Sequence, residues 1–257
     1  MTYFCTLASG SAGNSAFYFD GRRRVLIDAG KNVRYLSSQL RWLGTGVEEL
    51  DYVLITHSHS DHVSALPVLM KHSRAVLVCS CDTYAAVAAK LPPDPPRILF
   101  APGETLNLGD CLVRTFATLH DAMGSCGYVV GAGRESVAFC TDTGTVTGEM
   151  FSAIRGSRAV VLEFNHDETL LKNGPYPYPL KLRILSDRGH LSNAFAGRVA
   201  AALCRDGTET LVLAHLSAEN NRPALALEAA TAALERAELR ADIRLAPRDG
   251  MCDPVFF

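Results

Sequence analysis

Short apolar runs alternate with longer segments of helical periodicity along the whole chain. Apolar spacing predicts strands at residues 3–7, 16–19, 25–27, 52–55, 75–78, 98–100, 112–117, 127–130, 137–140, 159–162, 211–214 and 242–245. The same pattern at helical spacing predicts helices at residues 33–43, 65–72, 83–90, 148–154, 194–204 and 224–239. Tandem strands in each half, with helices at intervals, predict an α/β (α+β) fold of two mixed sheets packed face to face with helices outside. No linker divides the chain, so we expect one domain over residues 1–257.

Composition narrows the class of protein. The 257 residues are 48% hydrophobic and 20% charged, which is typical of a globular protein and excludes a disordered tail. The 25 basic residues nearly balance the 27 acidic ones, which excludes a globally basic nucleic-acid binder but allows a local basic groove. No apolar run approaches the roughly 18 residues of a membrane helix, and the first ten residues do not resemble a signal peptide. Eight cysteines without CxxC spacing indicate a reducing cytoplasm.

The segment 56–62, Thr-His-Ser-His-Ser-Asp-His, follows the strand predicted at 52–55 and carries the most chemical information. Four metal-competent side chains stand within six residues, and burying them without a partner would be costly. Side chains at i and i+2 of an extended segment point the same way, so His57 and His59 can hold one ion. As the chain turns into a helix, Asp61 and His62 can face a second ion. Imidazole with carboxylate suits zinc, manganese or iron; the alternative, a solvated His-rich loop, fits poorly behind a buried strand.

Other metal-competent residues stand just past predicted strands. His120 follows the strand at 112–117, Asp142 the strand at 137–140, and His215 the strand at 211–214. Each alone would be ordinary, but functional groups collect where strand ends converge, so their common position indicates a site. Asp28 follows the strand at 25–27 and is expected either to orient a metal ligand or simply to end its strand.

These residues together resemble the metallo-β-lactamase superfamily, along nearly the whole chain and most specifically in the HxHxDH motif. The resemblance implies a four-layer αββα sandwich that holds two divalent ions at one edge. By the family pattern, His57, His59 and His120 would hold one ion, Asp61, His62 and His215 the other, and Asp142 would bridge them. Two ions about 3.5–4 Å apart can hold a hydroxide and clamp an in-line displacement, with Asp61 accepting the proton of the water. Phosphodiesters, lactams, lactones and thioesters all suit this chemistry.

Three further segments bear on the substrate. The loop at 9–15 offers Ser9, Ser11 and Asn14 to a phosphate, or is only a tight hairpin connection. Asn220 and Asn221 follow His215 in a donor-rich stretch. Residues 174–181 form a stiff aromatic segment whose tyrosines either stack on bases or pack on the sandwich, and Lys181, Arg183 and Arg188 would add salt-dependent attraction to a polynucleotide.

These segments together resemble one branch of the superfamily, the YycJ-type (WalJ-type) metallohydrolases. The resemblance is carried by residues 5–11, 14–15, 165–167, 174–177, 189–193 and 215–221. It implies a 5′-to-3′ exonuclease-like phosphodiesterase that acts on DNA with two zinc or manganese ions, iron being a further option. By analogy with phosphodiesterase branches, His190 or His166 would protonate the leaving oxygen or bind the scissile phosphate. The alternatives are a cyclic phosphodiesterase or lactonase of the same fold and, outside hydrolysis, a mono-iron redox enzyme or metal-stabilised binding module.

Overall fold

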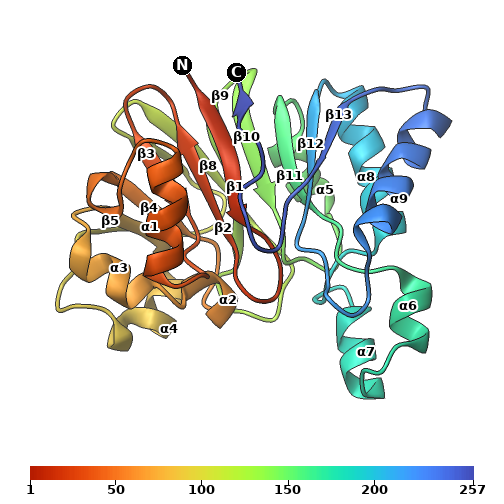
Figure 1. Ribbon diagram of the computed structural model, residues 1–257, viewed down its shortest axis with the longest axis horizontal. Helices are drawn as coiled ribbons and strands as arrows, with labels where there is room; N and C mark the ends of the chain where they lie inside the picture. Colours follow the sequence, from red (N-terminus) through yellow and green to blue (C-terminus); the bar gives the residue numbers. More distant parts are fainter. The chain divides into compact units, whose positions relative to one another are not determined.

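The computed structural model describes residues 1–257, which divide into two compact units (Figure 1). Unit 1 comprises Met1–Glu104, Ala122–Cys126 and Pro247–Phe257, and unit 2 comprises Thr105–Asp121 and Gly127–Ala246. Each unit is built on one seven-stranded mixed sheet. The prediction of two mixed sheets with helices around them is confirmed.

The sheet of unit 1 has the strand order β14-β1-β2-β3-β4-β5-β6. Its strands are β1 (Tyr3–Ala8), β2 (Ser15–Phe19), β3 (Arg24–Ile27), β4 (Tyr52–Ile55), β5 (Val76–Ser80), β6 (Arg97–Phe100) and β14 (Val255–Phe256). Its helices are α1 (Val33–Trp42), α2 (Ser60–Val63), α3 (Leu66–His72) and α4 (Cys81–Val87), with 3₁₀ turns at Val47–Glu49 and Ala88–Lys90. Strands β3 to β6 are parallel, whereas β14, β1, β2 and β3 pair antiparallel.

The sheet of unit 2 has the order β13-β12-β11-β10-β9-β8-β7. Its strands are β7 (Thr105–Leu108), β8 (Cys111–Ala117), β9 (Cys126–Ala132), β10 (Glu135–Cys140), β11 (Ala159–Glu163), β12 (Thr210–Ala214) and β13 (Asp242–Leu245). Its helices are α5 (Gly148–Ile154), α6 (Glu168–Asn173), α7 (Tyr178–Ile184), α8 (Asn193–Arg205) and α9 (Pro223–Arg236). Strands β10 to β13 are parallel, whereas β9 pairs antiparallel with β10, and β7 with β8.

Each unit has its own apolar core between its sheet and its helices. In unit 1, Leu36 and Leu40 of α1 are fully buried in the cluster that contains the inner residues of β3, β4 and β5. In unit 2, α8 and α9 bring small residues together, and a side chain added at Gly197 would lie 2.9 Å from the carbonyl oxygen of Ala229. The burial of these apolar faces fixes the strand ends, where the polar residues of interest lie.

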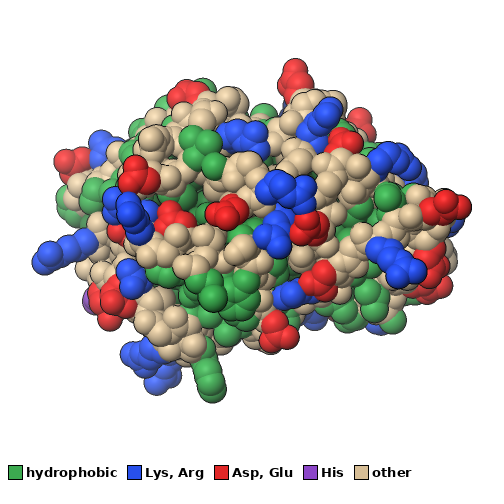
Figure 2. All heavy atoms as spheres, turned by 90° about the horizontal axis from the view of Figure 1, so that it is seen from above, with side chains coloured by type: hydrophobic (Ala, Val, Ile, Leu, Met, Phe, Trp, Pro, Cys, Tyr) green, Lys and Arg blue, Asp and Glu red, His purple; other side chains and the backbone are tan.

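The charged side chains on the surface do not mark a binding face by their sign. Figure 2 shows one face of the molecule, where basic and acidic side chains are interspersed rather than gathered by sign. This distribution agrees with a net charge of −2. None of the helices combines the length and the apolarity that crossing a bilayer requires.

Candidate metal centre

The His-rich motif of unit 1 begins directly after β4 and runs into the short helix α2. His57 and His62 are buried, and His59 and Asp61 are half-buried. The ring centre of His57 lies 4.7 Å from that of His59 and 4.1 Å from that of His62. The Asp61 Oδ2 atom lies 3.6 Å from His62 Nε2. The structure therefore gathers all four motif side chains, a donor set of imidazoles and a carboxylate that suits zinc, manganese or iron.

A buried carboxylate at the end of β3 supports this motif. Asp28 Oδ2 lies 2.8 Å from His62 Nδ1, and Asp28 Oδ1 accepts a 2.8 Å hydrogen bond from the Thr56 backbone N–H. The Thr56 hydroxyl donates to the same carboxylate over 2.9 Å. The contact with Asp28 fixes the orientation of the His62 ring. It also places the proton on Nδ1, because the carboxylate there accepts a hydrogen bond.

The loop between β1 and β2 lies against the same motif. The Asn14 side-chain amide Nδ2 is 3.3 Å from Asp61 Oδ2 and 3.0 Å from His62 Nε2, and the Asn14 backbone N–H donates to the Asp61 carbonyl over 2.7 Å. A side chain added at Gly30 would overlap that carbonyl oxygen, so only glycine fits this close approach. Ser9 in this loop is buried, whereas Ser11 is exposed.

Unit 2 brings a second group together from separate strands. The Asp142 Oδ1 atom lies 3.9 Å from His120 Nε2 and 3.5 Å from His215 Nε2, and all three residues are buried. Asp142, Glu163, His190 and His215 each offer a ligand atom within 4.8 Å of the others. This set also contains both imidazole and carboxylate donors, so it fits a divalent metal ion as the motif of unit 1 does.

Glu163, the last residue of β11, has a central position in this group and was missed at the sequence level. It is fully buried, and its Oε1 accepts from His190 Nδ1 over 2.8 Å and from His215 Nδ1 over 2.7 Å. Its Oε2 accepts from the Leu191 backbone N–H over 3.0 Å. Burial alone would raise the pKa of Glu163, but the adjoining imidazoles of His190 and His215 hold that pKa well below its usual range. Its place at a strand end, like those of Asp142 and His215, was the available signal.

Three residues of the two groups have backbone conformations that L-residues rarely adopt. Asp28, Asp142 and His215 have φ angles of 59°, 56° and 55°. Residues in this left-handed region occur preferentially at functional sites, where the surrounding structure holds them in place. Each stands just after a parallel strand, so the backbone turns sharply where the polar side chain is presented.

A buried amide network lies below His215. The Asn165 side-chain Nδ2 donates to the His215 carbonyl over 3.0 Å. Asn221 Nδ2 donates to the Phe164 carbonyl over 2.7 Å, and the Asn221 and Asn193 amides pair with each other over 2.9 Å. These contacts engage both ends of the Asn221 amide. Neighbouring Asn220, 1% exposed, contacts the Ser217 hydroxyl through its backbone and side-chain nitrogens.

The two candidate proton donors have different surroundings. The His190 side chain is 20% exposed and bonded to Glu163; burial alone would lower its pKa, but the carboxylate of Glu163 raises it. His166 is 1% exposed, and neither of its ring nitrogens has a hydrogen-bond partner. Burial lowers the pKa of His166 to about 4. The carboxylate partner and the greater exposure favour His190 as a proton carrier.

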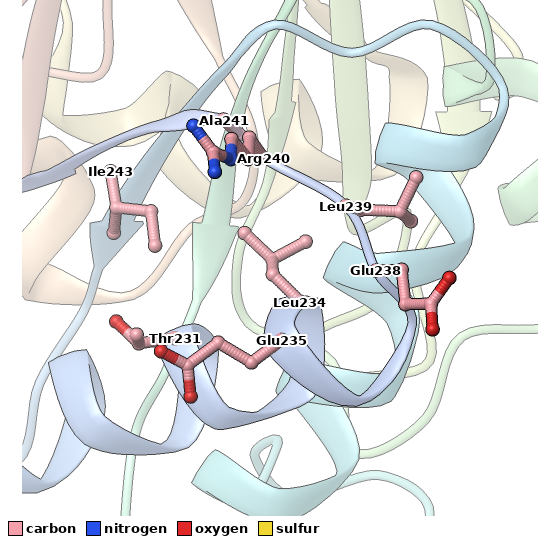
Figure 3. Close-up of a pocket in the computed structure, with 8 residues that line it drawn as sticks. All are labelled: Thr231, Leu234, Glu235, Glu238, Leu239, Arg240, Ala241 and Ile243. Atoms are coloured by element: carbon pink, nitrogen blue, oxygen red, sulfur yellow. The ribbon is translucent and has the colours of Figure 1, made fainter.

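A cavity of about 640 Å³ lies elsewhere in unit 2, between the end of α9 and β13 (Figure 3). Leu234, Leu239 and Ile243 line it, together with Glu235, Glu238 and Arg240. Its lining contains no histidine and no cysteine. It therefore lacks the imidazole and thiolate ligands that zinc sites in proteins use.

Comparisons with known proteins agree with this description. The family model of the beta-lactamase superfamily domain matches residues 23–216. The chain is 34% identical over 236 residues to the exodeoxyribonuclease YycJ of Bacillus anthracis, covering 91% of this chain and 89% of that protein. It is 34% identical over 228 residues to the exodeoxyribonuclease WalJ of Streptococcus pneumoniae, covering 87% and 84% respectively.

A solved structure matches the fold over nearly the whole length. The metallo-beta-lactamase fold protein YhfI from Bacillus subtilis superposes with a TM-score of 0.75 at 16% sequence identity, covering 98% of this chain and all of that one. At this identity the likeness concerns the fold.

Proposed function

Because the chain belongs to the beta-lactamase superfamily, in the group that contains YycJ and WalJ, we propose that it is a metal-dependent exodeoxyribonuclease acting from the 5′ end of DNA. The observation that carries the proposal is the 34% identity to exodeoxyribonucleases over about nine-tenths of the chain. Two groups of imidazole and carboxylate donors support it, since metal-assisted hydrolysis needs them.

We assign the metal ligands as the family pattern suggests. One divalent ion, zinc or manganese with iron as a further option, would be held by His57, His59 and His120, and a second by Asp61, His62 and His215, with Asp142 shared between them. Asp28 at His62 Nδ1 and Glu163 at His215 Nδ1 support this assignment, because a carboxylate at Nδ1 makes Nε2 the basic, ligating nitrogen.

The bound ions would polarise the phosphodiester and make a water molecule acidic near neutral pH. Asp61, half-buried beside His62, would accept the proton of that water. His190 would give a proton to the leaving oxygen from Nε2, since its Nδ1 is bonded to Glu163. His166, fully buried, is the second candidate for this role.

Substrate contacts are assigned to two loops. Ser9, Ser11 and Asn14 would bind a phosphate beside the motif, where Asn14 already contacts Asp61. Asn220 and Asn221 remain predicted substrate contacts, although the hydrogen bonds of Asn221 favour a role in holding the loop that carries His215.

We also infer that residues 1–257 act as one domain; a single cooperative unfolding transition is expected. Eight cysteines without a disulfide fit a reducing cytoplasm.

The decisive experiment measures metal content and DNA digestion on one preparation. Protein loaded with Mn²⁺ or Zn²⁺ is given linear DNA labelled at the 5′ or the 3′ end, cyclic nucleotides and lactones. We expect about two ions per chain and release of the 5′ label before the 3′ label. Cleavage of lactones or cyclic nucleotides alone would replace the nuclease proposal with a small-molecule hydrolase. A single iron per chain without hydrolysis would favour a redox role.

A further inference from the structure

Thr143, in the loop between β10 and α5, follows Asp142 directly and is fully buried. Its hydroxyl accepts a hydrogen bond from the Leu119 backbone N–H over 3.2 Å and donates one to the Thr145 carbonyl over 2.7 Å. One hydroxyl can do both, because it has one proton and two lone pairs. The Thr143 side chain therefore joins the loop after β10 to the segment that follows β8.

The two joined segments carry candidate metal ligands whose strands do not pair in the sheet. Leu119 precedes His120, and β9 lies between β8 and β10. The Gly144 backbone N–H donates to the Leu119 carbonyl over 3.2 Å, so both backbone polar groups of Leu119 are bonded to the loop after Asp142. These two hydrogen bonds tie together the backbones beside His120 and Asp142, whose side chains lie 3.9 Å apart between Nε2 and Oδ1.

The same loop contacts the carboxylate that orients two other histidines of unit 2. The Thr143 backbone N–H donates to Glu163 Oε2 over 3.4 Å, and the Leu191 backbone N–H donates to the same oxygen over 3.0 Å. Thr143 is therefore the residue at which the segments that carry His120, Asp142 and Glu163 meet.

The backbone next to Thr143 needs this support. Asp142 has a φ of 56°, and a residue with a side chain keeps such a conformation only where the surrounding structure holds it. Removal of the Thr143 hydroxyl would leave the Leu119 N–H and the Thr145 carbonyl without this partner. The loop would then be free to relax, and the Asp142 carboxylate would move with it.

We propose that Thr143 is a positioning residue, whose hydroxyl sets the separation of the His120 and Asp142 side chains and thereby the affinity of the site for its metal ions. This inference rests on the proposed ligand assignment, in which His120 holds one ion and Asp142 is shared between the two. Ligands that are already in place bind an ion more tightly, because less conformational entropy is lost on binding.

The test separates the hydroxyl from the shape of the side chain. Thr143→Val keeps the branched shape without the hydroxyl, and its affinity for Mn²⁺, measured by competition with a chelating dye, should weaken about tenfold. The visible absorption spectrum of the Co²⁺-loaded protein should change in the same variant, because it reports the geometry of the ligands. Thr143→Ser keeps the hydroxyl and should match the wild type in both measurements.

Thr208→Val is the matched control. Thr208 is also a buried threonine of unit 2, and its hydroxyl donates to the Ser157 carbonyl over 2.9 Å. Both residues precede β12 and β11, at the opposite ends of these strands from the candidate ligands. Each valine variant should be less stable than the wild type in urea denaturation of the metal-free protein. Only Thr143→Val should lose affinity for Mn²⁺.

Several outcomes would overturn the proposal. Unchanged Mn²⁺ affinity in Thr143→Val would do so, and so would an equal loss in Thr208→Val, which would indicate general destabilisation. A loss that Thr143→Ser shares would assign the effect to the methyl group. If Thr143→Val does not fold, Thr143→Ala takes its place with the same expected results.

Failure of the nuclease proposal can be told apart from failure of this inference. If the wild type binds Mn²⁺ but digests no DNA, the nuclease proposal fails, and the Mn²⁺ affinities and Co²⁺ spectra of the variants still decide the role of Thr143. If the wild type binds neither Mn²⁺ nor Co²⁺, the ligand assignment fails and the positioning role of Thr143 fails with it.

Discussion

The two groups of candidate metal ligands are assembled in different ways. In unit 1, four donors stand within the six residues from His57 to His62, and one loop after β4 brings them together. In unit 2, the donors come from positions scattered between His120 and His215, and the pairing of β10, β11 and β12 brings them together. The first group depends on local backbone conformation, and the second on the register of a sheet.

The orienting carboxylates differ in the same sense. Asp28 serves one histidine, His62, together with Thr56. Glu163 serves two histidines, His190 and His215, and is fully buried. Unit 2 therefore concentrates on one side chain the support that unit 1 divides among Asp28, Thr56 and Asn14, so we expect single substitutions to be more damaging in unit 2.

The largest effect is expected at Asp142, the proposed shared ligand. Asp142→Ala should reduce the rate of DNA hydrolysis by more than about a hundredfold, while the chain stays folded. This loss exceeds the roughly 10- to 100-fold loss that follows the removal of a residue that only orients a ligand. Metal content, turnover and the circular dichroism melt are measured together. Turnover close to that of the wild type would remove Asp142 from the proposed ligand set.

The next effect compares the two carboxylates directly. Glu163→Gln should weaken metal binding or turnover about a hundredfold and Asp28→Asn about tenfold, because the first change disturbs two histidines and the second only one. Metal affinity by competition with a chelating dye, alongside kcat on DNA, checks both. Equal losses, or a larger loss at Asp28, would break the comparison between the units.

Acid should reveal the histidine of unit 2 that has no carboxylate partner. The pKa of His166 is lowered by burial from 6.5 to about 4, so the unfolded chain binds a proton in this range that the folded chain does not. The free energy of unfolding should therefore fall as the pH drops from 6.5 to 4, by up to about 3 kcal/mol from this group. Urea denaturation at several pH values should show a smaller fall for His166→Gln; an identical fall would exclude His166 as the cause.

A smaller effect tests the close packing of unit 1. Gly30→Ala places a side chain on the Asp61 carbonyl oxygen and should lower the free energy of unfolding by about 1–3 kcal/mol, with weaker metal binding. Gly148→Ala is the matched control, because nothing lies within 4 Å of the added atom. If the two variants have the same free energy of unfolding, the backbone around Asp61 can move to accept the added side chain. The support of the unit 1 motif would then be less rigid than the close approach of Gly30 to Asp61 suggests.

Prediction from the sequence succeeded where residues that act together are also close together along the chain. The three histidines of the motif stand within six residues, directly after an apolar run. Apolar spacing likewise predicts most of the strands and helices that form the two sheets and cover them. Glu163 was not singled out, because a glutamate at the end of a strand looks like any polar boundary until β11 is seen between β10 and β12. Helix α7 was missed because prolines at 175, 177 and 179 read as a stiff extended segment, although the first turn of a helix tolerates proline.

The left-handed backbones of Asp28, Asp142 and His215 have a consequence for variation of this protein. Each holds a conformation that costs an L-residue about 1–2 kcal/mol and costs glycine almost nothing. Glycine at any of the three would relieve this backbone strain, but at Asp28 it would also remove the buried hydrogen bonds to Thr56 and His62, and at His215 the bond to Glu163. The relieved strain and the lost bonds have opposite signs and similar sizes, so the melting temperature of a glycine variant at these three corners would say little about the loss of its side chain.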